Sequence, residues 1–284
     1  MNSVIEIFVI THNRSAELER TVSSIIKSPL EKVKITILNN ASIDNTIDVS
    51  NKLIDKNNRI CLITNKCNIG ANANILRAIE LSESKYTWII CDDDDYNFSK
   101  VEDVIEKVNE GLIELIHVGA HDTTWKHGGV EATAHELMET AYNYFKFGSF
   151  LTCNIFKTSL FKERYLIPGY NNIINSYPHM PFLHGIYNSK SKIYISKEKI
   201  ITARVGNQSY DSSDWLIWWI NNSLLLGNKY DVRKAFFDHF NGRLSTPTIQ
   251  YIKEMRKTSE YHKKIIDQFI FRYFTWSEKF QYYF

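Results

Sequence analysis

Four consecutive aspartates, Asp92 to Asp95, directly follow the apolar run of residues 86–91. The run is short and rich in β-branched and aromatic residues, which predicts a buried strand. Carboxylates crowded at the end of such a strand are costly unless a cation neutralises them. Hard divalent ions prefer oxygen ligands and often bridge to the phosphates of a substrate. The cluster therefore predicts a site for Mn²⁺ or Mg²⁺ and a diphosphate, although a solvated acidic turn would have the same composition.

The first hundred residues alternate short apolar runs with amphipathic segments, which predicts a mostly parallel sheet with helices on both faces. The predicted strands are 5–10, 33–38, 60–64 and 86–91. The predicted helices begin near Ser15, which would be an N-cap, and cover 46–54 and 71–81. Ligands of such sheets bind outside the carboxyl ends of the strands. Polar clusters lie at all four of these ends, at 11–14, 39–40, 65–70 and 92–95.

The second half of the chain has a less regular pattern. Strands are predicted at 112–118, 147–156, 192–195 and 199–204. Residues 121–135 are predicted to be a polar loop with three solvated histidines, His121, His127 and His135. The pattern is helical from Trp215 onward, and Thr246-Pro247 is typical of a helix start with Thr246 as N-cap. We therefore predict an α/β domain over 1–208 and a helical extension over 209–284.

Composition limits the class of protein. The 284 residues are 44% hydrophobic, which is ample for a packed core, and the net charge of +2 gives no nucleic-acid-binding signal. The four cysteines have no zinc-like spacing, which predicts free thiols in a reducing compartment. No signal peptide and no apolar stretch of membrane-spanning length is recognisable. The expected location is the cytoplasm, with peripheral contact to the inner face of the cell membrane as an option.

The order and spacing of these motifs resemble family-2 glycosyltransferases of the GT-A fold. The resemblance is carried by residues 8–14, 38–46, 65–74 and the Asp92-Asp93-Asp94 triplet, while 177–179 and 204–207 are most similar to the abequosyltransferase-type subgroup. It implies an inverting, metal-dependent transfer of a sugar from a nucleotide-diphosphate donor to a saccharide acceptor. It also implies a role in bacterial surface polysaccharide (O-antigen, capsule or lipooligosaccharide), with lipid-linked acceptors as one option.

The resemblance also implies roles for individual residues. Asp94 would approach the metal and take part in catalysis, and Asp92 would contact the ribose or the metal. Four aspartates in a row permit two readings of the motif, so Asp93 and Asp95 stay open as alternatives. The remaining residues expected to bind the nucleotide sugar are Thr11, Asn13, Arg14, Asn39, Asn68, Gly70, Asn74, Asp93 and Arg204.

Two departures from the family pattern affect the predicted site. Asn39 stands where the family often has an aspartate, which leaves the nucleotide base open. The family's catalytic carboxylate is missing, and residues 176–181 stand in its place. Inverting transfer needs a base for the attacking hydroxyl, and imidazole, with a pKa of about 6.5, suits this near neutrality. His179 is therefore the candidate, with a structural helix-start histidine as the equal alternative and Asp211 or Asp214 as carboxylate alternatives.

Two other functions fit parts of the sequence. A sugar-nucleotide-binding protein with a degenerate site would also lack the catalytic carboxylate. A haloacid-dehalogenase-type phosphatase also has Asp-x-Asp after a strand, but it needs Thr or Val where Tyr96 stands. The tail, residues 261–284, mixes aromatic residues with Lys263, Lys264, Arg272 and Lys279. Such a segment can lie in a membrane interface, or it can pack on its own domain or on a second subunit of a homo-oligomer.

Overall fold

The computed structural model describes residues 3–120, 128–140, 142–204 and 214–284. Within these ranges a nine-stranded mixed sheet has the order β3-β2-β1-β4-β8-β6-β9-β5, and β7 pairs with β9. The first four strands in this order are parallel to one another. They are β1 (Ile5–Thr11), β2 (Lys34–Asn39), β3 (Ile60–Thr64) and β4 (Tyr86–Cys91), as the apolar runs predict.

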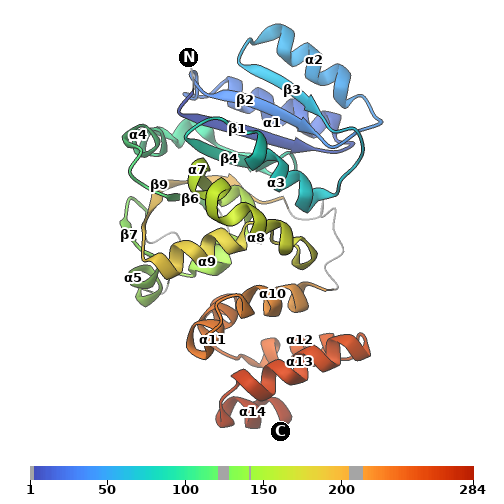
Figure 1. Cartoon of the computed structure of the whole chain (residues 1–284), viewed down its shortest axis with the longest axis vertical. Helices are drawn as coiled ribbons and strands as arrows, with labels where there is room; N and C mark the ends of the chain where they lie inside the picture. The colour runs from blue at the N-terminus through green and yellow to red at the C-terminus, as the bar shows by residue number, and fades with distance from the viewer. Residues whose placement is uncertain (1–2, 121–127, 141, 205–213) are drawn as a thin grey trace.

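Helices cover both faces of the parallel strands. Successive residues of a strand point to opposite faces of the sheet, and because both sets are apolar here, both faces have to be buried. Ile7 and Val9 share one core with α1 (Ser15–Ile26), α2 (Thr46–Lys56) and α4 (Glu102–Glu110). Phe8 shares the other core with α3 (Ala71–Leu81), which lies across the sheet in Figure 1. The mostly parallel α/β architecture predicted from the sequence is confirmed.

The middle of the chain adds short elements to this frame. The strands are β5 (Asp95–Tyr96), β6 (Leu115–Ala120), β7 (Glu131–Thr133), β8 (Asn154–Lys157) and β9 (Lys192–Thr202). The α-helices are α5 (Ala134–Glu139), α6 (Tyr144–Ser149), α7 (Thr158–Leu160), α8 (Leu166–Asn171) and α9 (Met180–Ser189). Single turns of 3₁₀ helix are Phe98–Lys100, Leu151–Cys153 and Ile173–Asn175, and a π-helical turn is Phe161–Tyr165.

Several predictions for this middle region are wrong. The strand predicted at 147–156 is present only over 154–156, in β8. The residues before it are mostly helical, because the Asn154 amide donates to the carbonyls of Gly148, Phe150 and Leu151 and holds them in turns. The two strands predicted around 192–204 are the single strand β9. His135 is helical rather than in a solvated loop, and its ring stacks on Tyr187. His121 and His127 lie outside the described residues.

The helical extension predicted from Trp215 onward is confirmed. It consists of α10 (Trp215–Leu224), α11 (Lys229–Asp238), α12 (Thr246–Met255), α13 (Glu260–Tyr273) and α14 (Trp276–Tyr283), at one end of the long axis in Figure 1. Two predicted caps are wrong by one position. Ser245, not Thr246, caps α12 by accepting a hydrogen bond from the Thr248 amide, and Ser15 is already inside α1.

The extension and the α/β part share one hydrophobic core. Trp219 and Phe269 of the extension belong to the same buried cluster as Phe8 and the helix α3. A buried amide pair joins the two parts as well, since Asn172 donates to the Asn222 side chain at 2.8 Å. The boundary predicted at 208/209 falls outside the described residues and stays a prediction.

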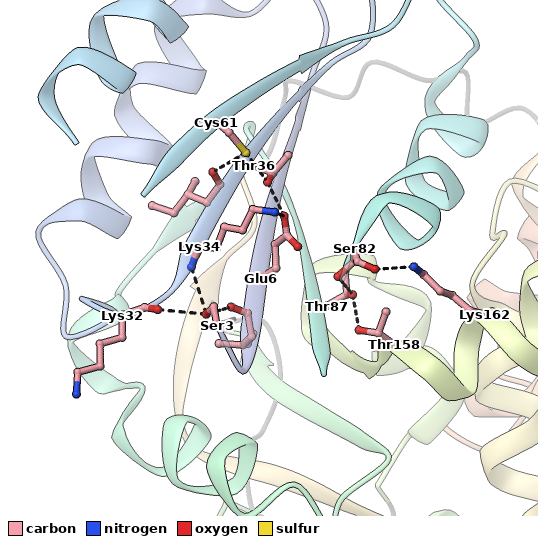
Figure 2. Close-up of polar contacts among 12 residues, drawn as sticks. Ser3, Glu6, Lys32, Lys34, Thr36, Cys61, Ser82, Thr87, Thr158 and Lys162 are labelled. Carbon is pink, nitrogen blue, oxygen red and sulfur yellow. Dashed lines mark hydrogen bonds and ion pairs between the residues drawn. The ribbon is translucent and has the colours of Figure 1, made fainter. Parts of the chain in front are cut away.

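Buried polar side chains join the amino ends of the parallel strands (Figure 2). Glu6 of β1 is only 1% exposed, and it accepts from Lys34 at 2.9 Å and from the Thr36 hydroxyl at 2.5 Å. The Thr36 hydroxyl also lies 3.0 Å from the Cys61 thiol of β3. The four cysteines are free, as predicted. This network lies at the opposite end of the strands from the aspartates.

Candidate active site

The carboxyl ends of the four parallel strands lie at one edge of the sheet. Thr11 pairs in register with Asn39, Asn39 with Thr64, and Ile10 with Cys91. The polar segments that follow these strands therefore start side by side. The sheet brings together the four clusters that the sequence predicted to meet.

The aspartates alternate between buried and partly exposed side chains. Asp92 and Asp94 are 4% and 7% exposed, whereas Asp93 and Asp95 are partly open to solvent. Asp93 pairs with Arg14 at 2.9 Å, and Asp95 pairs with the Arg204 guanidinium at 2.9 Å. In this structure Arg204 therefore faces an aspartate at the end of β9.

A second arginine fixes the backbone of the aspartate turn. Arg20 of α1 donates to the carbonyl oxygens of Asp92 and Asp94, each at 3.1 Å, and lies 3.5 Å from the Asp95 carboxylate. The Thr21 hydroxyl donates to the same Asp92 carbonyl. These contacts hold the turn through its main chain.

The buried carboxylates resist ionisation. Burial raises the pKa of Asp92 to about 6, and the neighbouring charge of Asp93 adds to this. Burial, again with Asp93, raises the pKa of Asp94 to about 7. Arg14 reaches Asp92 only at 3.4 Å, and no arginine or lysine of the described chain forms an ion pair with Asp94. A cation placed here would stabilise both charges.

These two side chains fit a hard divalent ion. The buried Asp92 Oδ2 makes no hydrogen bond to the described residues. Across the described ranges no cluster of three or more histidine, cysteine, aspartate or glutamate side chains could enclose a metal. Mg²⁺-type sites commonly use one or two carboxylates and take further oxygens from water and substrate phosphates. The donor set of Asp92 and Asp94 matches that pattern.

The first two loops hold each other in an uncommon conformation. The Asn13 amide donates to the Ser42 hydroxyl, and the Asn13 side chain accepts from the Ile43 amide, both at 2.8 Å. Asn13 and Ala41 have φ angles of 54° and 58°, which a non-glycine residue rarely adopts. Backbone in this region persists only where its surroundings impose it, and it clusters at binding sites.

Side-chain amides hold the third loop against the second. The Asn40 side chain donates to Asn68 at 2.8 Å and accepts from Asn65 at 3.0 Å, and Asn65 also donates to Asn74 at 2.8 Å. Asn74 is buried and donates onward to the Leu38 carbonyl. These contacts give Asn68 and Asn74, both predicted to bind the nucleotide sugar, a part in building the floor of the site.

Two further predicted residues shape the backbone of these loops. Asn39 is buried, and its side-chain oxygen accepts from the Ser42 amide at 3.0 Å. Gly70 has a φ of 84° directly before α3, a conformation that favours glycine, and its amide donates to Asn68. Thr11 is buried at the end of β1, where its carbonyl accepts from Asn40.

His179 lies in the core beside α9. It is buried, and its Nε2–H donates to the Gly148 carbonyl at 3.0 Å. Burial lowers the pKa of His179 to about 4, so the ring stays neutral at physiological pH. Its described contacts join none of the aspartate-turn residues. Among the carboxylate alternatives, Asp214 is 51% exposed and accepts from His262 at 2.6 Å, and Asp211 lies outside the described residues.

Sequence reasoning missed several residues that build the site. Arg20, Asn40 and Asn65 hold the aspartate turn and the loops, and His12 lies 3.2 Å from the Asn68 amide. Asn40 and Asn65 stand inside the polar clusters, so their position was a usable signal. Arg20 is one of several charged residues on α1, and nothing in its spacing distinguishes it.

Comparisons with known proteins agree with this geometry. Residues 6–166 match the family description "Glycosyl transferase family 2". TarS from S. aureus, residues 1–349, has a TM-score of 0.60 and 14% identity over 92% of this chain and 82% of that one. Its complex with UDP-GlcNAc has a TM-score of 0.60 and 13% identity, over 92% and 83%. No curated protein matches the sequence.

A more distant neighbour is the mannosyltransferase PcManGT from Pyrobaculum calidifontis, in complex with GDP-Man and Mn²⁺. Its TM-score is 0.53 and its identity 9%, over 94% of this chain and 74% of that one. The fold and the acidic turn together define a GT-A protein. The family match spans more than half of the sequence, and the chain belongs to glycosyl transferase family 2. This membership leaves the phosphatase alternative without support.

Proposed function

We propose that the chain is a metal-dependent, inverting glycosyltransferase that moves a sugar from a nucleotide-diphosphate donor to a saccharide acceptor. The family supports the reaction class. UDP-GlcNAc in one structural neighbour and GDP-Man in another support a nucleotide-sugar donor. The resemblance of 177–179 and 204–207 to the abequosyltransferase-type subgroup supports a role in bacterial O-antigen, capsule or lipooligosaccharide, with lipid-linked acceptors included. The proposed location is the cytoplasm.

The buried pair of Asp92 and Asp94 is the observation that carries this proposal. Burial raises both pKa values, and no lysine or arginine of the described chain pairs with Asp94. The two carboxylates would hold Mn²⁺ or Mg²⁺, and such an ion would offset the negative charge of the leaving diphosphate. Asp93 and Asp95 have the closer arginine contacts, 2.9 Å each, whereas Arg14 lies 3.4 Å from Asp92 and no arginine of the described chain pairs with Asp94. This favours Asp92 and Asp94 as the motif.

Other residues of the chain would bind and orient the donor. Arg14 spans Asp92 and Asp93 at the edge of the site, where its guanidinium can turn to a phosphate. Asn13 and the asparagine network fix the loops on either side of the expected base and ribose positions. Their role in this proposal is to preorganise the pocket, so that binding energy is not lost in ordering it.

The identity of the base stays a proposal. His179 is the candidate from the sequence, but its burial and a pKa of about 4 support a positioning role near Gly148. Asp214 has a carboxylate that is open to solvent at the start of α10. We therefore propose Asp214 as the carboxylate to test beside His179.

The test is a binding and turnover assay with UDP-, GDP-, CDP- and dTDP-sugars, each with and without Mn²⁺. A donor that binds the folded protein raises its melting temperature, and Mn²⁺ should increase this shift for the correct donor. The protein should then release the nucleoside diphosphate when an acceptor is present. Metal-enhanced binding without any turnover would support the degenerate sugar-nucleotide-binding alternative, and turnover in excess EDTA would refute metal dependence.

A further inference from the structure

The last helix has its apolar face outside. Trp276 and Phe280 of α14 are 87% and 66% exposed, Phe284 at its C-cap is 91% exposed, and Tyr283 is exposed beside them. Their spacing of i, i+4, i+7 and i+8 places them on one stripe of the helix. In a helix that only covers its own domain, the large apolar side chains face inward.

The opposite face of α14 attaches the helix to the protein. Glu278 forms a two-point ion pair with Arg233 of α11, with both nitrogen–oxygen distances 2.9 Å. Tyr282 is buried on the same side, and Glu278 also completes a capping box with Thr275. The orientation of α14 is therefore fixed by specific contacts, and these contacts hold the aromatic stripe outward.

Positive charge accompanies the stripe. Lys279 lies over the rings of Phe271 and Trp276, 5.1 Å and 5.2 Å from their centroids. Phe271 is itself highly exposed and extends the stripe onto α13. The two acidic residues of 261–284, Asp267 and Glu278, are both bound by arginines. The net charge beside the exposed aromatic rings is therefore positive.

We propose that the aromatic stripe of α14, together with Phe271 and Lys279, docks on an anionic lipid bilayer. Tryptophan and phenylalanine side chains enter the boundary between headgroups and acyl chains, and neighbouring lysines bind anionic headgroups. The aromatic stripe would enter the boundary between headgroups and acyl chains, and Lys279 would bind the anionic headgroups. The contact surface is at the extension's end of the long axis, on elements separate from β1–β4 (Figure 1).

Charge favours a bilayer over a second copy of the chain. A twofold contact through this stripe would bring two Lys279 side chains to the centre of one small interface. Lysine is depleted from the centres of protein interfaces, and α14 has only eight residues with which to build one. An anionic membrane is instead complementary to the same lysine. Across the described residues, no helix is long and apolar enough to cross a membrane.

Sedimentation of the full chain with lipid vesicles tests this contact. At low salt the protein should pellet with vesicles that contain phosphatidylglycerol, and far less with pure phosphatidylcholine. The double variant Trp276→Ser, Phe280→Ser should reduce binding about tenfold or more, because two large apolar side chains are lost. Lys279→Gln should reduce it about fivefold at low salt and much less at high salt. Leu112→Ser, an exposed leucine distant in sequence, is the matched control.

Tryptophan fluorescence of the wild type provides a second test, which does not require the double variant to fold. Anionic lipids brominated on their acyl chains should quench part of the wild-type emission, and Trp276→Phe should remove that part while the protein still pellets. Failure of the wild type to pellet, or equal pelleting of the double variant, would overturn the proposal. A concentration-dependent dimer that the double variant loses, without vesicle binding, would replace the bilayer with a second copy. None of these measurements needs donor or turnover, so their outcome is independent of the proposed enzyme activity.

Discussion

Glu6 and Asp94 are buried carboxylates of the same α/β domain, and they differ in the cations around them. Glu6, near the amino end of β1, has Lys34 at 2.9 Å (Figure 2). Asp94, beyond the carboxyl end of β4, has no lysine or arginine ion pair within the described chain, and burial raises its pKa to about 7. Folding itself supplies the partner at the amino end. At the carboxyl end we propose that a bound metal ion supplies the positive charge.

The two ends therefore serve different purposes. Lys34 is 43% exposed, so it neutralises a buried charge while its own head stays hydrated, and Glu6 in turn raises the pKa of Lys34 against the effect of its burial. The aspartate turn keeps two carboxyl groups in a site that disfavours their ionised form. A protein tolerates such a cost where it serves binding or catalysis. Substitutions at the carboxyl end are therefore expected to change function, and substitutions at the amino end to change stability.

The largest effect is expected from Asp94→Asn. The variant should lower turnover about 10³-fold, the upper size of the loss when one group that stabilises developing charge is removed. Melting curves with the donor should no longer depend on Mn²⁺. Asp55→Asn, at an exposed position on α2, is the matched control. If Asp94→Asn keeps turnover within a fewfold of wild type, the proposal that Asp94 serves catalysis is wrong.

The second effect compares the two candidates for the base, the buried imidazole of His179 and the exposed carboxylate of Asp214. Asp214→Asn should lower kcat about 10²-fold if its carboxylate is the base, with little change in donor affinity. His179→Ala should mainly lower stability, since it removes the hydrogen bond to the Gly148 carbonyl. Steady-state kinetics and melting curves of both variants decide the assignment. A large kcat loss in His179→Ala at unchanged stability would restore His179 as the base.

The third effect tests the amino end of the strands by removing the cation beside its buried carboxylate. Lys34→Met leaves the Glu6 carboxylate buried without its cation, and the free energy of unfolding should fall by about 2–3 kcal/mol near pH 8. Urea unfolding measures this, with Lys52→Met on the surface of α2 as the control. Donor affinity and its Mn²⁺ dependence should not change. A specific loss of donor binding would mean that the two ends are not independent.

The parallel half of the fold was predictable because its signals are local. Each strand of β1–β4 is a short apolar run, and each polar cluster follows one directly in the sequence. The aspartates that we propose as metal ligands could be predicted for the same reason. The strand predicted at 147–156 forms only from Asn154 onward, as β8, because the Asn154 side chain binds three preceding carbonyls and holds them in turns. The pattern of apolar residues does not indicate such side-chain hydrogen bonds.

The partners of the aspartates were not predictable. Asp93 pairs with Arg14, which lies 79 positions before it, and Asp95 pairs with Arg204, which lies 109 positions after it and just beyond β9. Only the packing of β5 against β9 brings Arg204 to Asp95. Four identical residues in a row therefore acquire two environments from parts of the chain that no local pattern connects.

The smallest effect is a gain of stability. A carboxyl group whose pKa is raised in the folded state holds a proton there that the unfolded chain has already released, so stability falls as pH rises through that interval. For Asp94 the interval runs from its usual value of 3.8 to about 7. This raised pKa corresponds to a cost of about 4 kcal/mol for the ionised form of Asp94 in the folded chain. An asparagine avoids that cost, but its buried amide is itself costly, so we expect Asp94→Asn to increase the free energy of unfolding by about 2 kcal/mol. The gain should be absent near pH 4, complete above pH 7 and cancelled when the wild type binds Mn²⁺ with its donor.

Urea unfolding of the metal-free proteins between pH 4 and pH 8 measures this gain. A variant that is less stable than wild type at pH 8 would show that the folded chain itself compensates the Asp94 charge, and the contrast with Glu6 would disappear.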